Sequence, residues 1–188
     1  MNTSRKPAKC DGGSKRPRRS LFNRFRRNSD GGSIIEFAMI AGPFFALMIA
    51  IFETTLIFFT QSALETGIAN AGRMIRTGQV QSDGLTEAQF KALVCDSLAG
   101  YLDCNNKVTV DVRSFSDFAS IALPDALGDD GEVSGATEFS PGDASEVVVV
   151  RAFYVWDMLT PDHFTGMANM SGARRLLGAA TAFRNEPF

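Results

Sequence analysis

The feature that most constrains this chain is the apolar run Ile34–Phe59, which contains no Lys or Arg and only two ionisable residues, Glu36 and Glu53. A helix of this length is roughly 39 Å long, and a bilayer core needs about 30 Å. Pro43 would disrupt a long soluble helix, but a membrane helix tolerates it as a kink. The run therefore predicts a membrane-spanning helix rather than the core helix of a globular domain.

Charge predicts the orientation of this helix. Residues 1–30 hold ten Lys and Arg residues against Asp11 and Asp30, a net charge of +8. Because the whole chain carries −2, residues 31–188 carry −10. Basic flanks stay in the cytoplasm, so we expect a cytoplasmic amino terminus and a periplasmic carboxyl-terminal part, with a single pass through the inner membrane. We expect no nucleic-acid partner, since the basic arm leads directly into the span.

Two other amino-terminal signals fit less well. A secretory signal peptide has a shorter apolar region, and the only A-x-A-like tripeptide nearby, Ala69-Asn70-Ala71, lies well beyond Phe59. Arg18-Arg19 faintly resembles a twin-arginine signal, but a polar spacer separates it from a run that is too long.

The junction Gly31-Gly32-Ser33-Ile34-Ile35-Glu36-Phe37 resembles the processing signal of type IV pilin-like proteins. With basic leader, span and ectodomain, the chain resembles a TadE-like minor pilin, or pseudopilin, of the Flp/Tad tight-adherence pilus system. The resemblance implies cleavage by a prepilin-type peptidase after Gly31, with cleavage after Gly32 as the alternative. It also implies a role in pilus assembly, adhesion and biofilm formation, with other Tad pilins and the inner-membrane assembly platform as partners.

Glu36 and Phe37 are the predicted assembly residues. Cleavage after Gly31 would create an α-ammonium on Gly32, four residues before Glu36 and within one helical turn of it. The two charges could neutralise each other within a subunit or between neighbours. The competing interpretation is that Glu36 simply reaches the lipid headgroups. For Glu53 we expect the headgroup interface on the far side of the inner membrane, with hydrogen bonding within a helix bundle as the alternative.

We divide the chain into a leader, residues 1–31, a transmembrane helix, residues 32–60, and a periplasmic pilin-like domain, residues 61–188. Beyond Phe59 the helix should continue as an amphipathic one that stops at Gly78; its apolar stripe is Leu64, Ile68, Ala71 and Ile75.

A second helix should begin at the capping box Thr86–Gln89 and end near residues 100–103. Cys95 and Cys104 bracket that end, and in an oxidising periplasm two such thiols predict a disulfide. Cys10 lies in the leader and would be lost on processing.

Strands are expected at Val108–Val112, where one face should be wet, at Glu146–Met158 and at Arg174–Arg184. Residues 124–145, rich in Gly, Asp, Glu and Ser, should form a flexible surface loop. The predicted fold class is α+β: a long amino-terminal transmembrane and amphipathic helix, a short helix and an antiparallel sheet of about three strands.

Nothing in the sequence points to catalysis, and we expect no enzyme activity, no cofactor and no metal. His163 is the only histidine, and the acidic residues around Gly128 and Gly131 lack the spacing of a calcium loop. Two alternatives to a minor pilin stay open: an uncleaved single-pass inner-membrane component of a secretion or pilus machine, and a secreted periplasmic binding domain.

Overall fold

The computed structural model describes residues 32–188 apart from 97, 99–101, 129 and 162–164. It divides into two units, residues 1–45 and 46–188, and each is described by itself. The helices are α2 (Gly32–Arg76), α3 (Gln79–Ser82), α4 (Glu87–Asp96), α5 (Cys104–Lys107) and the 3-10 turn η2 (Phe118–Ser120); the strands are β1 (Val108–Phe115), β2 (Val147–Asp157) and β3 (Arg174–Arg184). The predicted α+β class is confirmed.

The long helix α2 runs through Pro43 without ending and stops where the sequence predicts. Gly78 takes a left-handed backbone conformation with φ of 75°, and its N–H donates to the Ile75 carbonyl at 3.0 Å. A glycine adopts this conformation at little cost, so it terminates the helix.

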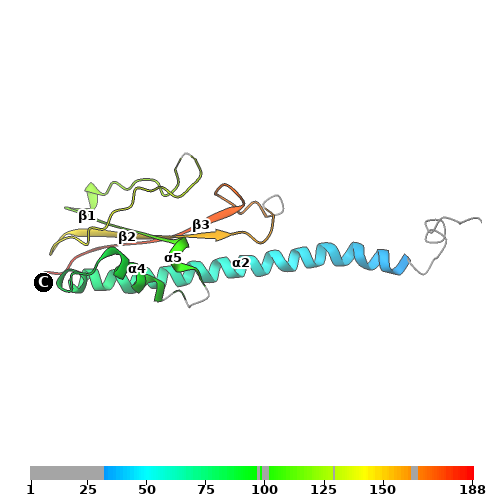
Figure 1. The fold of residues 1–188 in the computed structure, drawn as a ribbon, viewed down its shortest axis with the longest axis horizontal. Coiled ribbons are helices and arrows are strands. Elements are labelled where there is room, and N and C mark those ends of the chain that lie inside the picture. Colours follow the sequence, from blue (N-terminus) through cyan, green and yellow to red (C-terminus); the bar gives the residue numbers. More distant parts are fainter. Residues whose placement is uncertain (1–31, 97, 99–101, 129, 162–164) are drawn as a thin grey trace, which may run out of the picture. The chain divides into compact units, whose positions relative to one another are not determined.

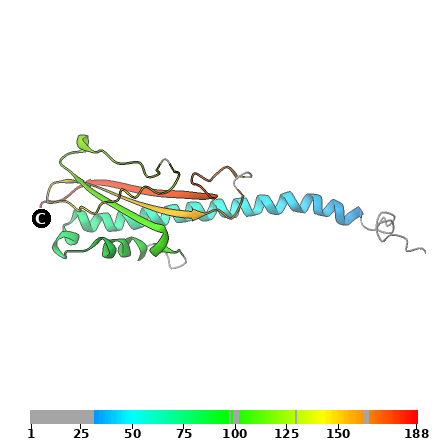
Figure 2. The same ribbon diagram turned by 45° about the horizontal axis from the view of Figure 1, so that its top comes forward.

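The three strands form one antiparallel sheet in the order β1-β2-β3, as expected. Val112 pairs with Val150 across the first ladder, and Val150 pairs with Thr181 across the second. This register places alternate residues of all three strands on one face, which covers the second unit's part of α2 (Figures 1 and 2).

The core lies between that face and α2. Four apolar helix residues are buried there at the predicted spacing, and so are three valines of β1: Leu64, Ile68, Ala71, Ile75, Val108, Val110 and Val112. A Cβ added at Gly72 would lie 2.9 Å from Cε1 of Phe183 and 3.2 Å from Cγ2 of Thr181. Gly72 therefore allows β3 to approach the helix more closely than any other residue would.

Helix α4 begins at the predicted capping box but ends earlier than expected. Thr86 N–H donates to Oε1 of Gln89 at 2.9 Å, and Gln89 N–H donates back to Oγ1 of Thr86 at 3.4 Å. The helix ends at Asp96 rather than near residue 100. The Cα atoms of Cys95 and Cys104, which form a disulfide, are 5.8 Å apart, whereas nine helical residues would separate them by about 13.5 Å, so one helix cannot contain both cysteines.

The outer face of the sheet is not exposed to solvent at β1, contrary to the prediction from the sequence. Asp111 is only 1% exposed, and Val147 and Val149 beside it are buried as well. Pro124 and Glu138 of the connection from β1 to β2 bond to side chains on this face. Val112 exchanges backbone hydrogen bonds with the same connection: Val112 N–H donates to the Glu138 carbonyl and Ser140 N–H donates to the Val112 carbonyl, both at 2.8 Å. The described residues of 124–145 form no helix or long strand, and Glu138 and Ser140 bond to the edge of β1.

Candidate assembly and anchoring site

The predicted assembly residues lie on the first turns of α2. Gly32 is the first residue of the helix, and Glu36 and Phe37 are both exposed. Gly31, the predicted last residue of the leader, lies outside the described residues. The one-turn spacing between Gly32 and Glu36 is therefore helical spacing, as the charge-neutralisation hypothesis requires.

Glu36 is surrounded along the helix by large apolar side chains that no part of the described chain covers. They are between 50% and 74% exposed: Ile34, Ile35, Phe37, Met39, Ile40, Phe44, Phe45, Leu47, Met48, Ile49, Ile51 and Phe52. A contiguous apolar surface of this size is not stable in water and marks contact with lipid or protein. Among the described residues, one helix is both long enough and apolar enough to cross a membrane, and that helix is α2.

Contrary to our expectation, Glu53 does not extend outward toward lipid headgroups; it forms hydrogen bonds inside the protein instead. Its side chain is fully buried, and its carboxylate accepts hydrogen bonds from three donors. These are the backbone N–H of Leu159, the backbone N–H of Thr160 at 3.0 Å and the Thr160 hydroxyl. The carboxylate thus fastens the connection between β2 and β3 to α2.

Two further contacts join the same connection to the helix and sheet. The Thr54 hydroxyl, which donates to the Ala50 carbonyl at 2.8 Å, lies 3.9 Å from Sδ of Met167. Arg175 at the start of β3 donates to the carbonyl of Met167. Sequence reasoning missed this cluster because its partners lie more than a hundred residues apart. The one available signal was a carboxylate in an apolar run, which requires a partner wherever it is buried.

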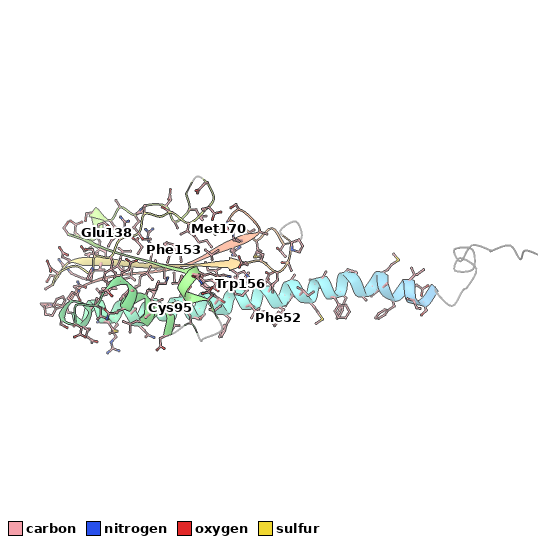
Figure 3. The ribbon with its side chains drawn as sticks, viewed as in Figure 1. Phe52, Cys95, Glu138, Phe153, Trp156 and Met170 are labelled. Atoms are coloured by element: carbon pink, nitrogen blue, oxygen red, sulfur yellow. A yellow bond between two sulfur atoms is a disulfide. The ribbon has the colours of Figure 1, made fainter. Side chains whose placement is uncertain are left out.

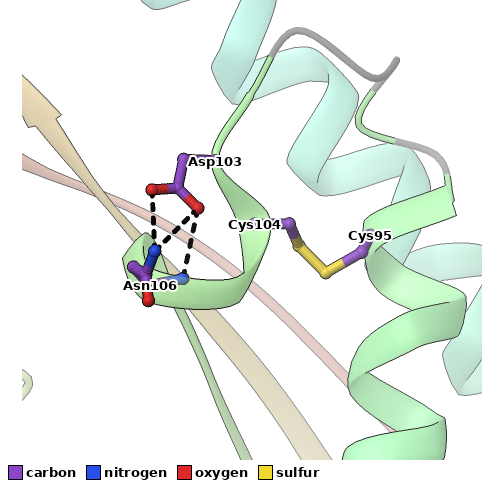
Figure 4. Close-up of a disulfide and its surroundings, with 4 residues drawn as sticks. All are labelled: Cys95, Asp103, Cys104 and Asn106. Atoms are coloured by element: carbon purple, nitrogen blue, oxygen red, sulfur yellow. Dashed lines mark hydrogen bonds between the residues drawn. A yellow bond between two sulfur atoms is a disulfide. The ribbon is translucent and has the colours of Figure 1, made fainter.

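The structure pairs Cys95 with Cys104 in a disulfide that joins the last turn of α4 to the start of α5 (Figure 4). Asp103 caps α5 by accepting hydrogen bonds from Asn106, at 3.4 Å from its N–H and 3.0 Å from its Nδ2. These bonds lower the pKa of the Asp103 carboxyl. Lys107 forms a 2.5 Å ion pair with Asp157 of β2, and this hydrogen bond raises the pKa of the ammonium.

The buried carboxylate of Asp111 organises the outer face of the sheet. It accepts from Nε of Arg113 at 3.0 Å, from Nη2 of Arg151 at 2.6 Å and from the N–H of Glu138 at 2.9 Å. Arg151 also donates to the carbonyl of Pro124 at 2.7 Å and lies over the ring of Phe153, 5.4 Å from its centre. The cluster therefore holds Pro124 and Glu138 on the sheet.

The acidic residues considered as a calcium loop serve local contacts. Asp130 Oδ1 accepts from the N–H of Glu132 at 3.0 Å, and Glu132 pairs with Ser171 and Arg174. No group of three His, Cys, Asp or Glu residues that could hold a metal occurs among the described residues. His163 and Cys10 lie outside them.

Comparison with known proteins gives one finding. Residues 31–73 match the model of the TadE-like protein family, which confirms over this segment the resemblance inferred from the sequence. The match covers the junction from Gly31 onward and α2 almost to its end at Arg76. No curated protein and no solved structure matches the chain.

Proposed function

We propose that this chain is a minor pilin of the TadE-like type that takes part in assembling a tight-adherence pilus and so supports surface adhesion and biofilm formation. The observation that carries the proposal is that one segment combines the family match with an uncovered apolar helix bearing a lone carboxylate near its start, Glu36. The role is structural, and we propose no catalytic activity for the chain.

The membrane-spanning part of α2 is proposed to end where the folded domain begins. The first fully buried side chain on the helix is that of Glu53. The preceding stretch, residues 32–52, has roughly 20 residues and a helical length of about 30 Å, the thickness of a bilayer core. Because Phe58, Phe59 and Leu159 are apolar and exposed by 54% to 70%, we place them in contact with lipid close to the headgroup level. In this proposal the periplasmic boundary of the inner-membrane span lies before residue 60.

Orientation follows from the basic leader, which stays in the cytoplasm, so that residues 53–188 face the periplasm. The disulfide between Cys95 and Cys104 is compatible with this compartment, since disulfides persist in an oxidising environment. A prepilin-type peptidase would then reach Gly31 from the cytoplasmic side and release residues 1–31.

Glu36 is proposed to neutralise the α-ammonium that cleavage creates on Gly32, within one subunit or on a neighbouring one. In hydrocarbon each charge alone is costly, so a subunit whose ammonium and carboxylate meet is favoured over one in which they do not. This preference can hold subunits in register as they leave the membrane for the fibre. Other Tad pilins and the inner-membrane assembly platform are the corresponding partners.

Replacing Glu36 with Ala tests the proposal. One carboxylate near the interface adds little to the cost of inserting so apolar a helix, so the variant should reach the membrane and be cleaved but lose pili and surface attachment. Glu65→Ala, on an exposed part of α2, is the matched control and should behave as wild type. Normal pili with Glu36→Ala would contradict the assigned role.

An uncleaved single-pass component of a pilus or secretion machine is the second candidate. The same helix and domain would serve it, and it differs only in keeping residues 1–31. Replacing Gly31 with Leu distinguishes the two: the variant should accumulate at full length and lose function if cleavage is required, and keep function if it is not.

A further inference from the structure

One edge of the sheet is open along β3. In a strand, the N–H and C=O groups of alternate residues point to the same side. On the free side of β3, Asn169 bonds both the N–H and the C=O of Leu176, at 2.7 Å and 3.5 Å, and Nε2 of Gln61 bonds the Gly178 carbonyl at 2.7 Å. The next residues in this series are Ala180 and Ala182, both exposed, and within the described chain nothing bonds their free-side backbone groups.

The opposite edge of the sheet is closed by the chain itself. Val112 of β1 exchanges backbone hydrogen bonds with Glu138 and Ser140 at 2.8 Å. On the free side of β3 the edge is closed again at Glu186, whose N–H donates to the Arg76 carbonyl at 2.9 Å.

The open part thus lies between Gly178 and Glu186, and residues 178–182 are its uncharged part. Folded proteins usually protect an edge strand with a charged residue, a proline or a bulge. The window from Gly178 to Ala182 has none of these: its side chains are those of glycine, alanine and threonine, and its pairing with β2 is continuous.

A groove runs beside this window, between β3 and the last turns of α2. It is lined by Ala69, Gly72, Arg73 and Arg76 from the helix and by residues 181–183 from the strand. Arg76 is neutralised by Glu186 at 3.0 Å, whereas Arg73 is exposed and forms no ion pair within the described chain. The groove therefore combines free backbone donors and acceptors with one uncompensated positive charge.

We propose that the edge of β3 from Gly178 to Ala182 is a docking site for an extended segment of another protein. The segment joins the sheet as a fourth strand, paired with β3 through main-chain hydrogen bonds, and it carries a carboxylate that lies near Arg73. Backbone hydrogen bonds would supply the affinity and the carboxylate the specificity, as in other cases of strand addition. The small side chains of the window leave the incoming backbone unobstructed.

Antiparallel pairing with the same edge of a second copy does not fit the proposed membrane span. Two β3 edges that pair in antiparallel fashion are related by a two-fold axis that also reverses α2, which runs alongside β3 (Figure 1). Two membrane-spanning helices of one orientation cannot satisfy that axis in one bilayer. This step alone rests on the proposed membrane span; the open edge and Arg73 do not depend on it.

The test uses the full chain in detergent micelles and two peptides, acetyl-Thr-Val-Glu-Val-Thr-Val-amide and the same peptide with Lys in place of Glu. We expect saturable binding by fluorescence anisotropy, up to about fivefold tighter for the acidic peptide, the range of one exposed ion pair. Bound peptide should slow hydrogen exchange at the amides of Ala180 and Ala182. The variant Ala180→Pro should not bind, while Ala180→Val, which keeps the N–H, should.

Arg73→Glu provides a second readout that leaves the strand intact, and it should reverse the preference between the two peptides. Unchanged fluorescence of Trp156 shows that each variant is folded. Equal binding by Ala180→Pro and Ala180→Val, or no saturable binding of either peptide to the wild type, would overturn the proposal. Self-association that only Ala180→Pro abolishes would also overturn it, because the occupant would then be a second copy.

Discussion

Replacing Glu53 with Ala should destabilise the domain far more than the loss of a surface carboxylate would. Glu53 is fully buried and accepts hydrogen bonds from Leu159 and Thr160. Truncation leaves two backbone N–H groups and one hydroxyl without their acceptor, in a place where water does not replace it. It also opens a space between α2 and the connection from β2 to β3.

The magnitude follows from these groups. A hydrogen bond to a charged acceptor contributes about 1.5–3 kcal/mol, and a buried donor left unpaired costs about 1–3 kcal/mol. Since such terms do not add fully, we expect a loss of about 3–5 kcal/mol, the range for removing one partner of a buried charged contact. A domain is typically stable by about 5–15 kcal/mol, so most of a modest stability would be lost.

Urea unfolding of the full chain in micelles measures this effect, with the single tryptophan, Trp156, as the fluorescent reporter (Figure 3). Glu65→Ala on the same helix is the matched control, because Glu65 is exposed and bonds only Gln61, at 3.0 Å; it should cost no more than about 0.5 kcal/mol. Hydrogen exchange at the amides of Leu159 and Thr160 should accelerate in Glu53→Ala alone. If the two variants differ by less than about 1 kcal/mol, the reasoning is refuted.

Three further outcomes are expected. Replacing both cysteines of the disulfide with serine should cost about 2.5–3 kcal/mol in the chain-entropy model, given the nine-residue separation, and identical unfolding curves would speak against it. Gly72→Val forces side-chain atoms against β3 and should cost about 1–3 kcal/mol, whereas Gly42→Val, with open space around it, should show no packing cost in the same unfolding assay. The pKa of Asp103 is lowered by its bonds from Asn106, so its stabilisation is present above the ordinary pKa of 3.8 and is lost as pH falls through the lower folded value. In Asp103→Asn the free energy of unfolding should fall less steeply with decreasing pH below about pH 4. The same dependence on pH as in the wild type would exclude this linkage.

Local patterns were sufficient to predict most of the elements. The helical stripe from Leu64 to Ile75, the capping box at Thr86 and the left-handed stop at Gly78 depend on residues within a few positions of one another. The strand at Arg174–Arg184 was predicted with the bounds that the structure has. Each of these signals is carried by its own segment, and tertiary packing did not override it.

What the sequence did not reveal depends on contacts between distant segments. Asp111 sits in an alternating pattern typical of a wet face, and it is buried only because Arg113, Arg151 and the Glu138 backbone surround it. The sequence around Glu53 is typical of an interfacial carboxylate, but its partner Thr160 lies 107 residues later in the chain. Short-range periodicity carries no information on any of these partners.

The amino-terminal residue of the protein in the membrane fraction tests the central claim most directly. Intact-mass measurement and amino-terminal sequencing of the purified chain should identify Gly32 as the first residue, with residues 1–31 removed, and Gly31→Leu should yield the full-length chain. A wild-type chain that begins at Met1 or Asn2 would contradict processing as a pilin, and one that begins near Gly72 would show release from the membrane by a signal peptidase.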